Sequence, residues 1–139
     1  IEAAKEQVLA LKDKADILIA VTHLSLEQDM KLAETVPEID LILGGHEHEN
    51  IQVWRGPNFT PIFKADANVR SVYIHTLAYN TKTKRLQILP EFAADRTHHR
   101  QRLKVPHIII GDSQLQNKIN YSFAVLSSVN VISNAVNFI

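Results

Sequence analysis

The sequence predicts an α/β fold, in which a parallel βαβ unit is followed by antiparallel strands. Two short apolar runs, 17–21 and 40–43, have the length and the branched residues of strands buried on both faces of a sheet. A helical pattern separates them, so the strands are expected to be parallel neighbours joined by a right-handed crossover. From residue 60 onward, strand-like segments at 60–64, 69–79 and 85–89 are joined by turns, which favours an antiparallel arrangement.

Two helices complete the prediction, and each has a local reason. The opening stretch, 2–14, places its apolar residues on one helical face. Acids lead this stretch and lysines close it, as the helix dipole favours. A second helix is expected over 26–36, because Ser25 is a suitable N-cap and Pro37 ends the helix.

A change in composition divides the chain into two predicted parts. The whole chain has 139 residues, of which 45% are hydrophobic, enough for one domain with its own core. Of its 15 acids only Asp112 lies beyond residue 97. We therefore expect one domain over 1–92 and a divergent tail over 93–139. The apolar end of the tail, 121–139, holds many Asn and Ser residues, which favours an internal helix or a poorly specified tail over a membrane span.

The charge balance and the lack of cysteine exclude several kinds of function. The 15 basic and 15 acidic residues cancel, so no overall field recruits nucleic acid or an anionic membrane. With no cysteine, the chain has no disulfide, thiolate metal site or cysteine nucleophile. The first residues are typical of an amphipathic helix rather than a signal peptide, which leaves the location of the protein open.

Three of the seven histidines follow the two predicted parallel strands. His23 comes after the first strand, and His46 and His48 come after Gly44-Gly45 at the end of the second. The carboxyl ends of parallel strands meet at one edge of the sheet, where ligands bind. The glycines allow either unusual backbone angles or a close backbone approach there.

Imidazole donors indicate the kind of ion that this edge would bind. Neutral imidazole suits zinc, manganese, iron or nickel better than magnesium or calcium. A single histidine at a strand end is usually a surface residue or one satisfied by its neighbours. Three at one edge are better explained as metal ligands, so the sequence predicts a metal site at His23, His46 and His48.

The two histidine segments, 22–24 and 39–48, resemble the last two motifs of calcineurin-like metallophosphoesterases, and most of all the bifunctional metallophosphatase/5′-nucleotidase family. Segment 60–68 is similar to the strand that follows in these proteins, and the resemblance covers roughly Ile1 to Leu89. It implies part of a layered two-sheet (α/β/β/α) metallophosphatase fold, with 1–92 as the C-terminal part of the metallophosphatase domain.

The resemblance also implies a chemistry. His23 and His46 would bind one metal ion and His48 a second, and the ions would polarise a phosphoryl group and supply hydroxide from water. The implied reaction is hydrolysis of phosphate monoesters, with 5′-nucleotides as substrates. Glu47 and Glu49 would either orient an imidazole or lie solvated in the loop. No catalytic or substrate-binding residue is identified in this chain.

The family's earlier motifs, which supply a bridging Asp, an Asn ligand and a catalytic His, are absent from this sequence. Without the bridging carboxylate two cations would repel each other, so we expect at most one divalent transition metal ion, zinc, manganese or similar, in an incomplete site. The alternatives are a non-catalytic metal-binding fragment and a subunit that needs a partner chain to complete the site. An uncovered sheet edge would also favour self-association. Family members are commonly periplasmic or extracellular.

Overall fold

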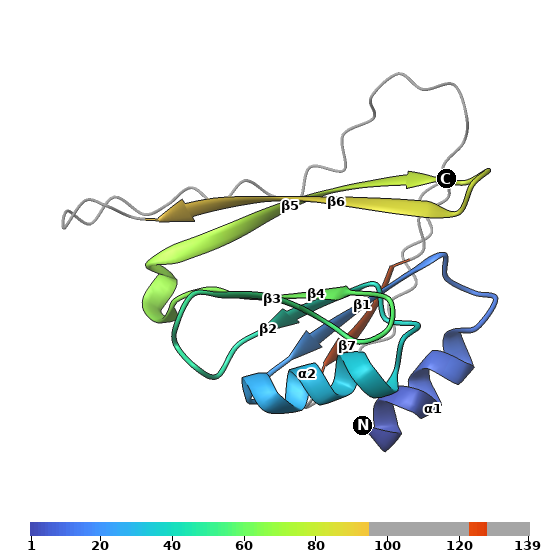
Figure 1. Cartoon of the computed structure of the whole chain (residues 1–139), viewed down its shortest axis with the longest axis horizontal. Coiled ribbons are helices and arrows are strands. Elements are labelled where there is room, and N and C mark those ends of the chain that lie inside the picture. The colour runs from blue at the N-terminus through green and yellow to red at the C-terminus, as the bar shows by residue number, and fades with distance from the viewer. Residues whose placement is uncertain (95–122, 128–139) are drawn as a thin grey trace.

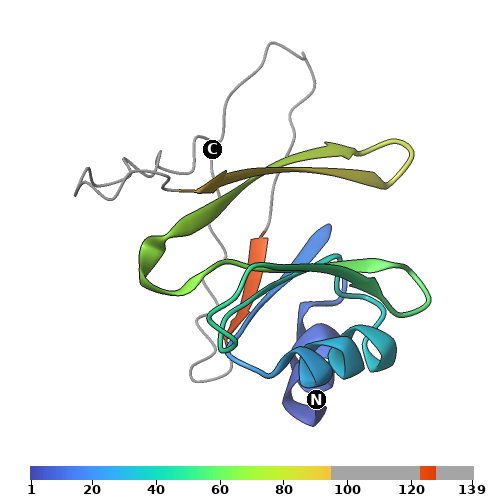
Figure 2. The same ribbon diagram turned by 60° about the vertical axis from the view of Figure 1, so that its left-hand side comes forward.

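The computed structural model describes residues 1–94 and the backbone of 123–127. These residues form three layers, which Figures 1 and 2 show from two sides. Helices α1 (Glu2–Leu11) and α2 (Leu26–Thr35) cover one face of a five-stranded sheet. The antiparallel hairpin of β5 (Ser71–Asn80) and β6 (Arg85–Ala94) lies over the other face. The predicted α/β class, with parallel and antiparallel strands and a second sheet, is confirmed.

The central sheet has the strand order β3-β4-β2-β1-β7. Its strands are β1 (Ile17–Thr22), β2 (Leu41–Gly44), β3 (Ile51–Arg55), β4 (Thr60–Lys64) and β7 (Phe123–Ser127). Strands β1 and β2 pair in parallel with α2 between them in the chain, so the predicted βαβ unit is confirmed. The pairing places Thr22 beside Gly44, which brings the carboxyl ends of both strands together.

Two strands of the central sheet differ from the sequence prediction. Strand β4 was expected to belong with the antiparallel segments; it pairs antiparallel with β3, but on its other side it pairs in parallel with β2 and so joins the central sheet. Its neighbouring residues Ile62 and Phe63 are both buried, one toward each face, as in an internal strand. Strand β3 was not predicted, because its polar residues Gln52 and Arg55 obscure the pattern of a strand at the sheet edge.

The central sheet buries side chains on both faces. Toward the helices, Leu18 and Ala20 of β1 pack in one hydrophobic cluster with Leu32 of α2. Toward the hairpin, Ile17 and Ile19 of the same strand pack in a second cluster. Strand β1 is therefore buried on both faces, as its continuous apolar run predicts.

The helix ends follow local sequence signals. Helix α2 starts with a capping box, in which the Ser25 hydroxyl accepts from the Gln28 N–H and the Gln28 side chain accepts from the Ser25 N–H. It ends just before Pro37, close to the predicted boundary. Helix α1 ends at Leu11, earlier than the predicted residue 14, and Asp13 in the following turn has a φ of 63°.

The predicted tail is only partly described. An internal helix or a poorly specified tail was expected over 121–139, but the backbone of 123–127 forms β7, parallel to β1. The helix prediction is wrong for these five residues, where backbone pairing along β1 favours a strand. The rest of the tail, at 95–122 and 128–139, lies outside the described residues. None of the described helices is both long and apolar enough to cross a membrane.

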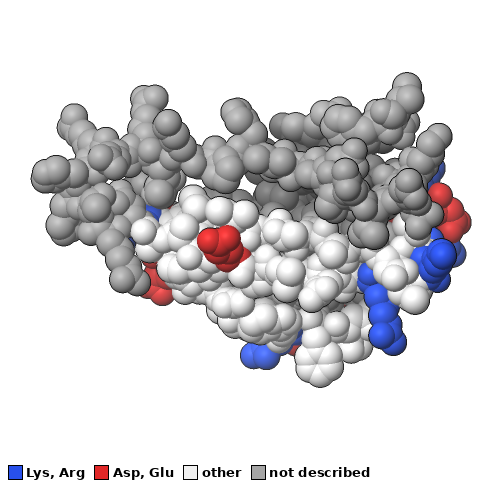
Figure 3. All heavy atoms as spheres, turned by 90° about the horizontal axis from the view of Figure 1, so that it is seen from above, with Lys and Arg blue, Asp and Glu red and all other residues white. Residues whose placement is uncertain are grey.

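The outer face of the hairpin side carries few charges among the described residues. Figure 3 shows this face from above, with mainly uncharged side chains and with Lys and Arg gathered mostly at one end. The part of this face that is uncovered in Figure 3 therefore presents no continuous basic surface.

Candidate metal site

The ends of β1 and β2 bring two of the three predicted ligands together. The Gly45 N–H donates to the Thr22 carbonyl at 3.1 Å, which continues the pairing of the strands into the loops. The rings of His23 and His46 then lie with their centroids 5.4 Å apart, edge to face. Both residues are exposed, so the pair opens onto solvent at the carboxyl edge of the sheet.

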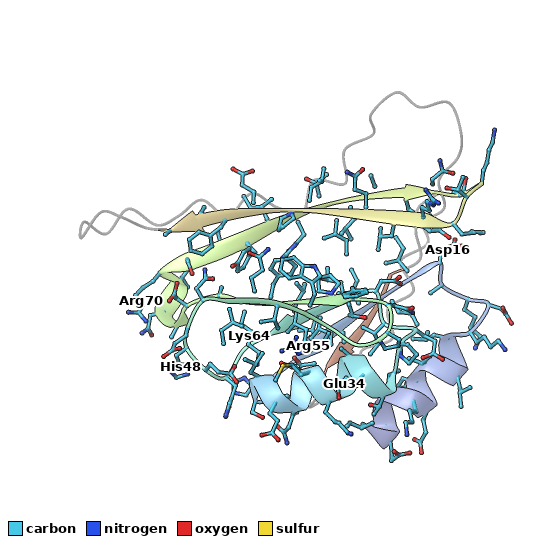
Figure 4. The ribbon with its side chains drawn as sticks, viewed as in Figure 1. Asp16, Glu34, His48, Arg55, Lys64 and Arg70 are labelled. Carbon is cyan, nitrogen blue, oxygen red and sulfur yellow. The ribbon has the colours of Figure 1, made fainter. Side chains whose placement is uncertain are left out.

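His48 does not join this pair. It is exposed on the loop that follows β2, and Figure 4 shows it at the outer end of the molecule. Its carbonyl accepts a hydrogen bond from the Ala67 N–H at 3.4 Å. Among the described residues, no group of three or more His, Cys, Asp or Glu side chains is arranged to hold a metal ion. The structure thus brings His23 and His46 together and leaves His48 apart.

The backbone of the histidine loop is unusual at the histidines and ordinary at the glycines. His46 has a φ of 90° and His48 a φ of 63°, both in the region that residues with side chains rarely adopt. Neither Gly44 nor Gly45 has a positive φ. Gly44 instead permits a close approach, because a Cβ there would lie 2.9 Å from the side chain of Lys64. Of the two expected roles for the glycines, close approach is therefore the one observed, at Gly44.

A buried lysine lies beneath the histidine loop. Lys64 ends β4, next to Gly44 of β2, and its side chain is 1% exposed. Its ammonium donates to the carbonyls of Leu24 at 2.6 Å and Gly45 at 2.9 Å. Figure 4 shows it between the central sheet and α2. The positive charge therefore lies directly under the two loops that carry His23 and His46.

Two carboxylates balance the charge of Lys64. Glu47 contacts the ammonium at 2.6 Å and Asp29 of α2 contacts it at 2.8 Å. The contact with Asp29 is an ion pair without a directed hydrogen bond, and the carboxylate of Asp29 is completely buried. A buried charge of this kind is stable only when it is paired, so the three residues act as one unit.

Glu47 differs from its sequence prediction. Its carboxylate accepts hydrogen bonds from Lys64 and from the N–H of Leu26 at the start of α2, so it is not a solvated loop acid. Burial raises the pKa of Glu47, but the hydrogen bonds from Lys64 and Leu26 outweigh this effect, and the pKa lies below its ordinary value. Its carboxylate accepts hydrogen bonds from these two groups rather than from an imidazole. Glu49 is exposed.

Lys64 and Asp29 were not singled out from the sequence. A signal for Lys64 existed, since it follows buried Ile62 and Phe63 at the end of a strand whose neighbour leads into the histidine loop. Asp29 had no such signal, because a polar residue in the first turns of a helix is ordinary. Only the fold shows that its side chain faces inward.

The donors that are present fit a transition metal in chemistry but not in number. Two imidazoles are suitable ligands for zinc or manganese. A tetrahedral zinc site takes four ligands, of which three come from the protein in catalytic sites. His23 and His46 would therefore supply part of a site, and the described residues supply no third ligand beside them.

About 50 residues of the chain are similar in sequence to parts of known proteins. The chain is 42% identical over 52 residues to the uncharacterized metallophosphoesterase YunD of Bacillus subtilis, a match that covers 37% of this chain and 11% of that protein. It is 42% identical over 50 residues to the apyrase of Aedes albopictus, covering 34% of this chain and 9% of the apyrase. It is 43% identical over 49 residues to the trifunctional nucleotide phosphoesterase protein YfkN of Bacillus subtilis, covering 34% and 3%.

These matches are short, and the chain spans only a small part of the length of the relatives. No family model matches the chain, and no solved structure matches it significantly. The identity over about 50 residues agrees with the resemblance of the histidine segments and with the mixed sheet. Together these similarities support a partial domain that is similar to metallophosphatases and 5′-nucleotidases.

Proposed function

We propose that the chain is part of a metal-dependent phosphoric monoester hydrolase of the 5′-nucleotidase kind. The observation that carries the proposal is the His23–His46 pair, held at the carboxyl edge of a parallel βαβ unit. The names of the relatives support the reaction class, since they describe a metallophosphoesterase, an apyrase and a nucleotide phosphoesterase.

His23 and His46 are the proposed ligands of one divalent transition metal ion, and His48 that of a second ion in a complete site. When bound, such an ion polarises a phosphoryl oxygen and makes hydroxide from water available at neutral pH. The described residues place the two imidazoles side by side and leave them accessible to solvent.

The site needs ligands that the described residues do not provide. No carboxylate among them joins His23 and His46 in a group of three. We infer that the missing ligands, including a carboxylate to bridge two ions, come from other parts of a longer polypeptide or from a partner chain. The same observation favours a second candidate, a non-catalytic fragment that binds one metal ion.

Metal binding and hydrolysis together test the proposal. Calorimetric titration with zinc or manganese should show binding by the purified chain, weakened at least about tenfold by His46→Ala, since a ligand is lost. The exposed Glu49→Ala variant is a control from the same loop and should bind as the wild type does.

Hydrolysis of AMP, with and without chelator, then separates the two candidates. We expect little turnover by the chain alone, and chelator-sensitive turnover once a partner or longer polypeptide supplies the missing ligands. A folded protein that binds neither metal, or a turnover that chelator and His46→Ala both leave intact, would contradict the proposal.

A further inference from the structure

We infer that Lys64 is a positioning residue, which holds the two loops of His23 and His46 in the geometry needed for a shared ligand. Its ammonium contacts both loops at positions next to the histidines. One bond goes to the carbonyl of Leu24, the residue after His23. Two more go to the carbonyl of Gly45 and the carboxylate of Glu47, on either side of His46.

The number of bonds matches what a lysine can donate. An ammonium has three protons, and Lys64 has three hydrogen-bond acceptors, all at 2.6–2.9 Å. The ion pair with Asp29 adds a contact from α2 at 2.8 Å. A single buried cation therefore ties β4 to α2 and to both histidine loops, which precede Lys64 by 17 to 40 residues in the sequence.

The lysine stem explains the first glycine of the histidine motif. A Cβ on Gly44 would lie 2.9 Å from both the Oδ2 of Asp29 and the Cε of Lys64, closer than real Cβ atoms approach, and 3.2 Å from the Cγ of Lys64, a tight contact. A Cβ on Gly45 would lie 3.5 Å from the Nδ1 of His23, an ordinary contact. Gly44 thus leaves the space through which Lys64 reaches the loops.

The unusual backbone of His46 shows why such a tie is needed. A φ of 90° is costly for a residue with a side chain, and it persists only where the surroundings hold it. Lys64 holds the residues on both sides of His46. Without the ammonium, we expect the loop to relax and the ring of His46 to move away from His23.

The test uses Lys64→Met, which removes the ammonium and keeps most of the stem. In the metal-free protein, NMR should show a contact between the ring protons of His23 and His46 in the wild type, and the variant should lose it. Zinc affinity should fall by about 10- to 100-fold, the usual effect of losing a group that orients metal ligands.

A matched control separates positioning from general destabilisation. Thr60 lies at the opposite end of β4, is buried, and donates to the carbonyl of Ile39 at 3.0 Å. The Thr60→Val variant also removes one buried hydrogen-bond donor from the strand but leaves the histidine loops alone. It should keep the ring contact and the zinc affinity of the wild type.

Lys64→Met leaves the carboxylate of Asp29 buried without a partner, which could prevent folding. A second variant is therefore needed. Lys64→Met combined with Asp29→Asn removes that charge, and Asp29→Asn alone is its control. We expect the ring contact to be lost in the double variant and kept in the single one.

The outcomes distinguish this inference from the proposed function, on which only its zinc arm rests. A folded lysine variant that keeps the ring contact overturns the inference, as does an equal loss in Thr60→Val. If the ring contact depends on Lys64 but the wild type binds no zinc, the positioning role stands and the proposed function fails.

Discussion

His75 is a partly buried residue, with both ring nitrogens buried, that the candidate site does not use. It lies on β5 between the two sheets, with its ring 4.6 Å from that of Phe63 and 5.7 Å from that of Tyr73, measured between centroids. Neither of its nitrogens has a hydrogen-bond partner among the described residues. Burial in this aromatic cluster lowers the pKa of His75. The folded protein therefore favours the neutral ring.

This placement predicts a loss of stability in mild acid. The unfolded chain binds a proton at His75 near its ordinary pKa of 6.5, whereas the folded chain resists protonation. Well above pH 6.5, His75 therefore does not lower the free energy of unfolding. As the pH falls below that value, His75 lowers this free energy progressively. His75→Phe keeps an aromatic ring and removes the titration, so its melting temperature should fall less between pH 7.5 and 5.

The other histidines are present in both proteins, so the difference between the two curves reports on His75. Thermal melts by circular dichroism at half-unit steps of pH would measure it. Parallel curves for the wild type and His75→Phe would show that the ring does not resist protonation in the fold.

At the scale of single residues, the sequence predicts which histidines lie close together better than it predicts the residues that hold their loops. His23 and His46 could be paired because parallel strands end at one edge, which follows from the βαβ pattern alone. The placement of His48 could not be derived, since it depends on backbone angles in an irregular loop. Lys64 and Asp29 contact each other only through the tertiary fold, and no local pattern joins them.

The first turn of helix α2 is capped both by its own residues and by a side chain from the histidine loop. Within the helix, Ser25 and Gln28 form the capping box. From outside, the carboxylate of Glu47 accepts from the N–H of Leu26, which would otherwise have no partner within the helix. The start of the helix and the histidine loop are therefore fixed by the same side chain.

The capping box can be tested separately. Ser25→Ala removes the acceptor for the Gln28 N–H and should lower the free energy of unfolding by about 1 kcal/mol, within the usual range of about 0.5–2. Ser25→Asp keeps an acceptor and suits the helix dipole, so it should remain close to the wild type. Urea denaturation would measure both, and equal midpoints for Ser25→Ala and the wild type would contradict the role of the cap.

Elements with strong local signals were predictable, and those defined by their neighbours were not. Strands β1 and β2 are apolar runs buried on both faces, and α2 has a clear cap and a proline stop. Strand β4 could be located, but its parallel partner could not be identified, because pairing is a property of the assembled sheet. Strand β7 lies in an Asn- and Ser-rich segment with no clear strand pattern. It is a strand because its backbone pairs with that of β1.

At the scale of the whole molecule, β1 is covered on every side, and one of its neighbours comes from the distant end of the chain. This strand lies between the helices and the hairpin and has β2 on one side. On its other side β7 pairs with it in parallel over five positions, from Ile17 to Val21. Figure 1 shows the two strands side by side. A segment from the predicted tail thus covers β1, and β7 becomes the edge strand of the sheet among the described residues.

Removal of this cover should change the behaviour of the whole chain. A chain that ends at Ala94 keeps both helices, the hairpin and the histidine pair, but it exposes the backbone donors and acceptors of β1 that pair with β7, from Ile17 to Val21. Unpaired edges of this kind recruit other strands, so we expect the shortened chain to self-associate and to melt at a lower temperature than the 139-residue chain. Sedimentation velocity at several concentrations would show the association, and thermal melts would show the loss of stability. If the two chains sediment as monomers and melt alike, β7 does not protect the edge of β1, and the segment after Ala94 is dispensable for the fold.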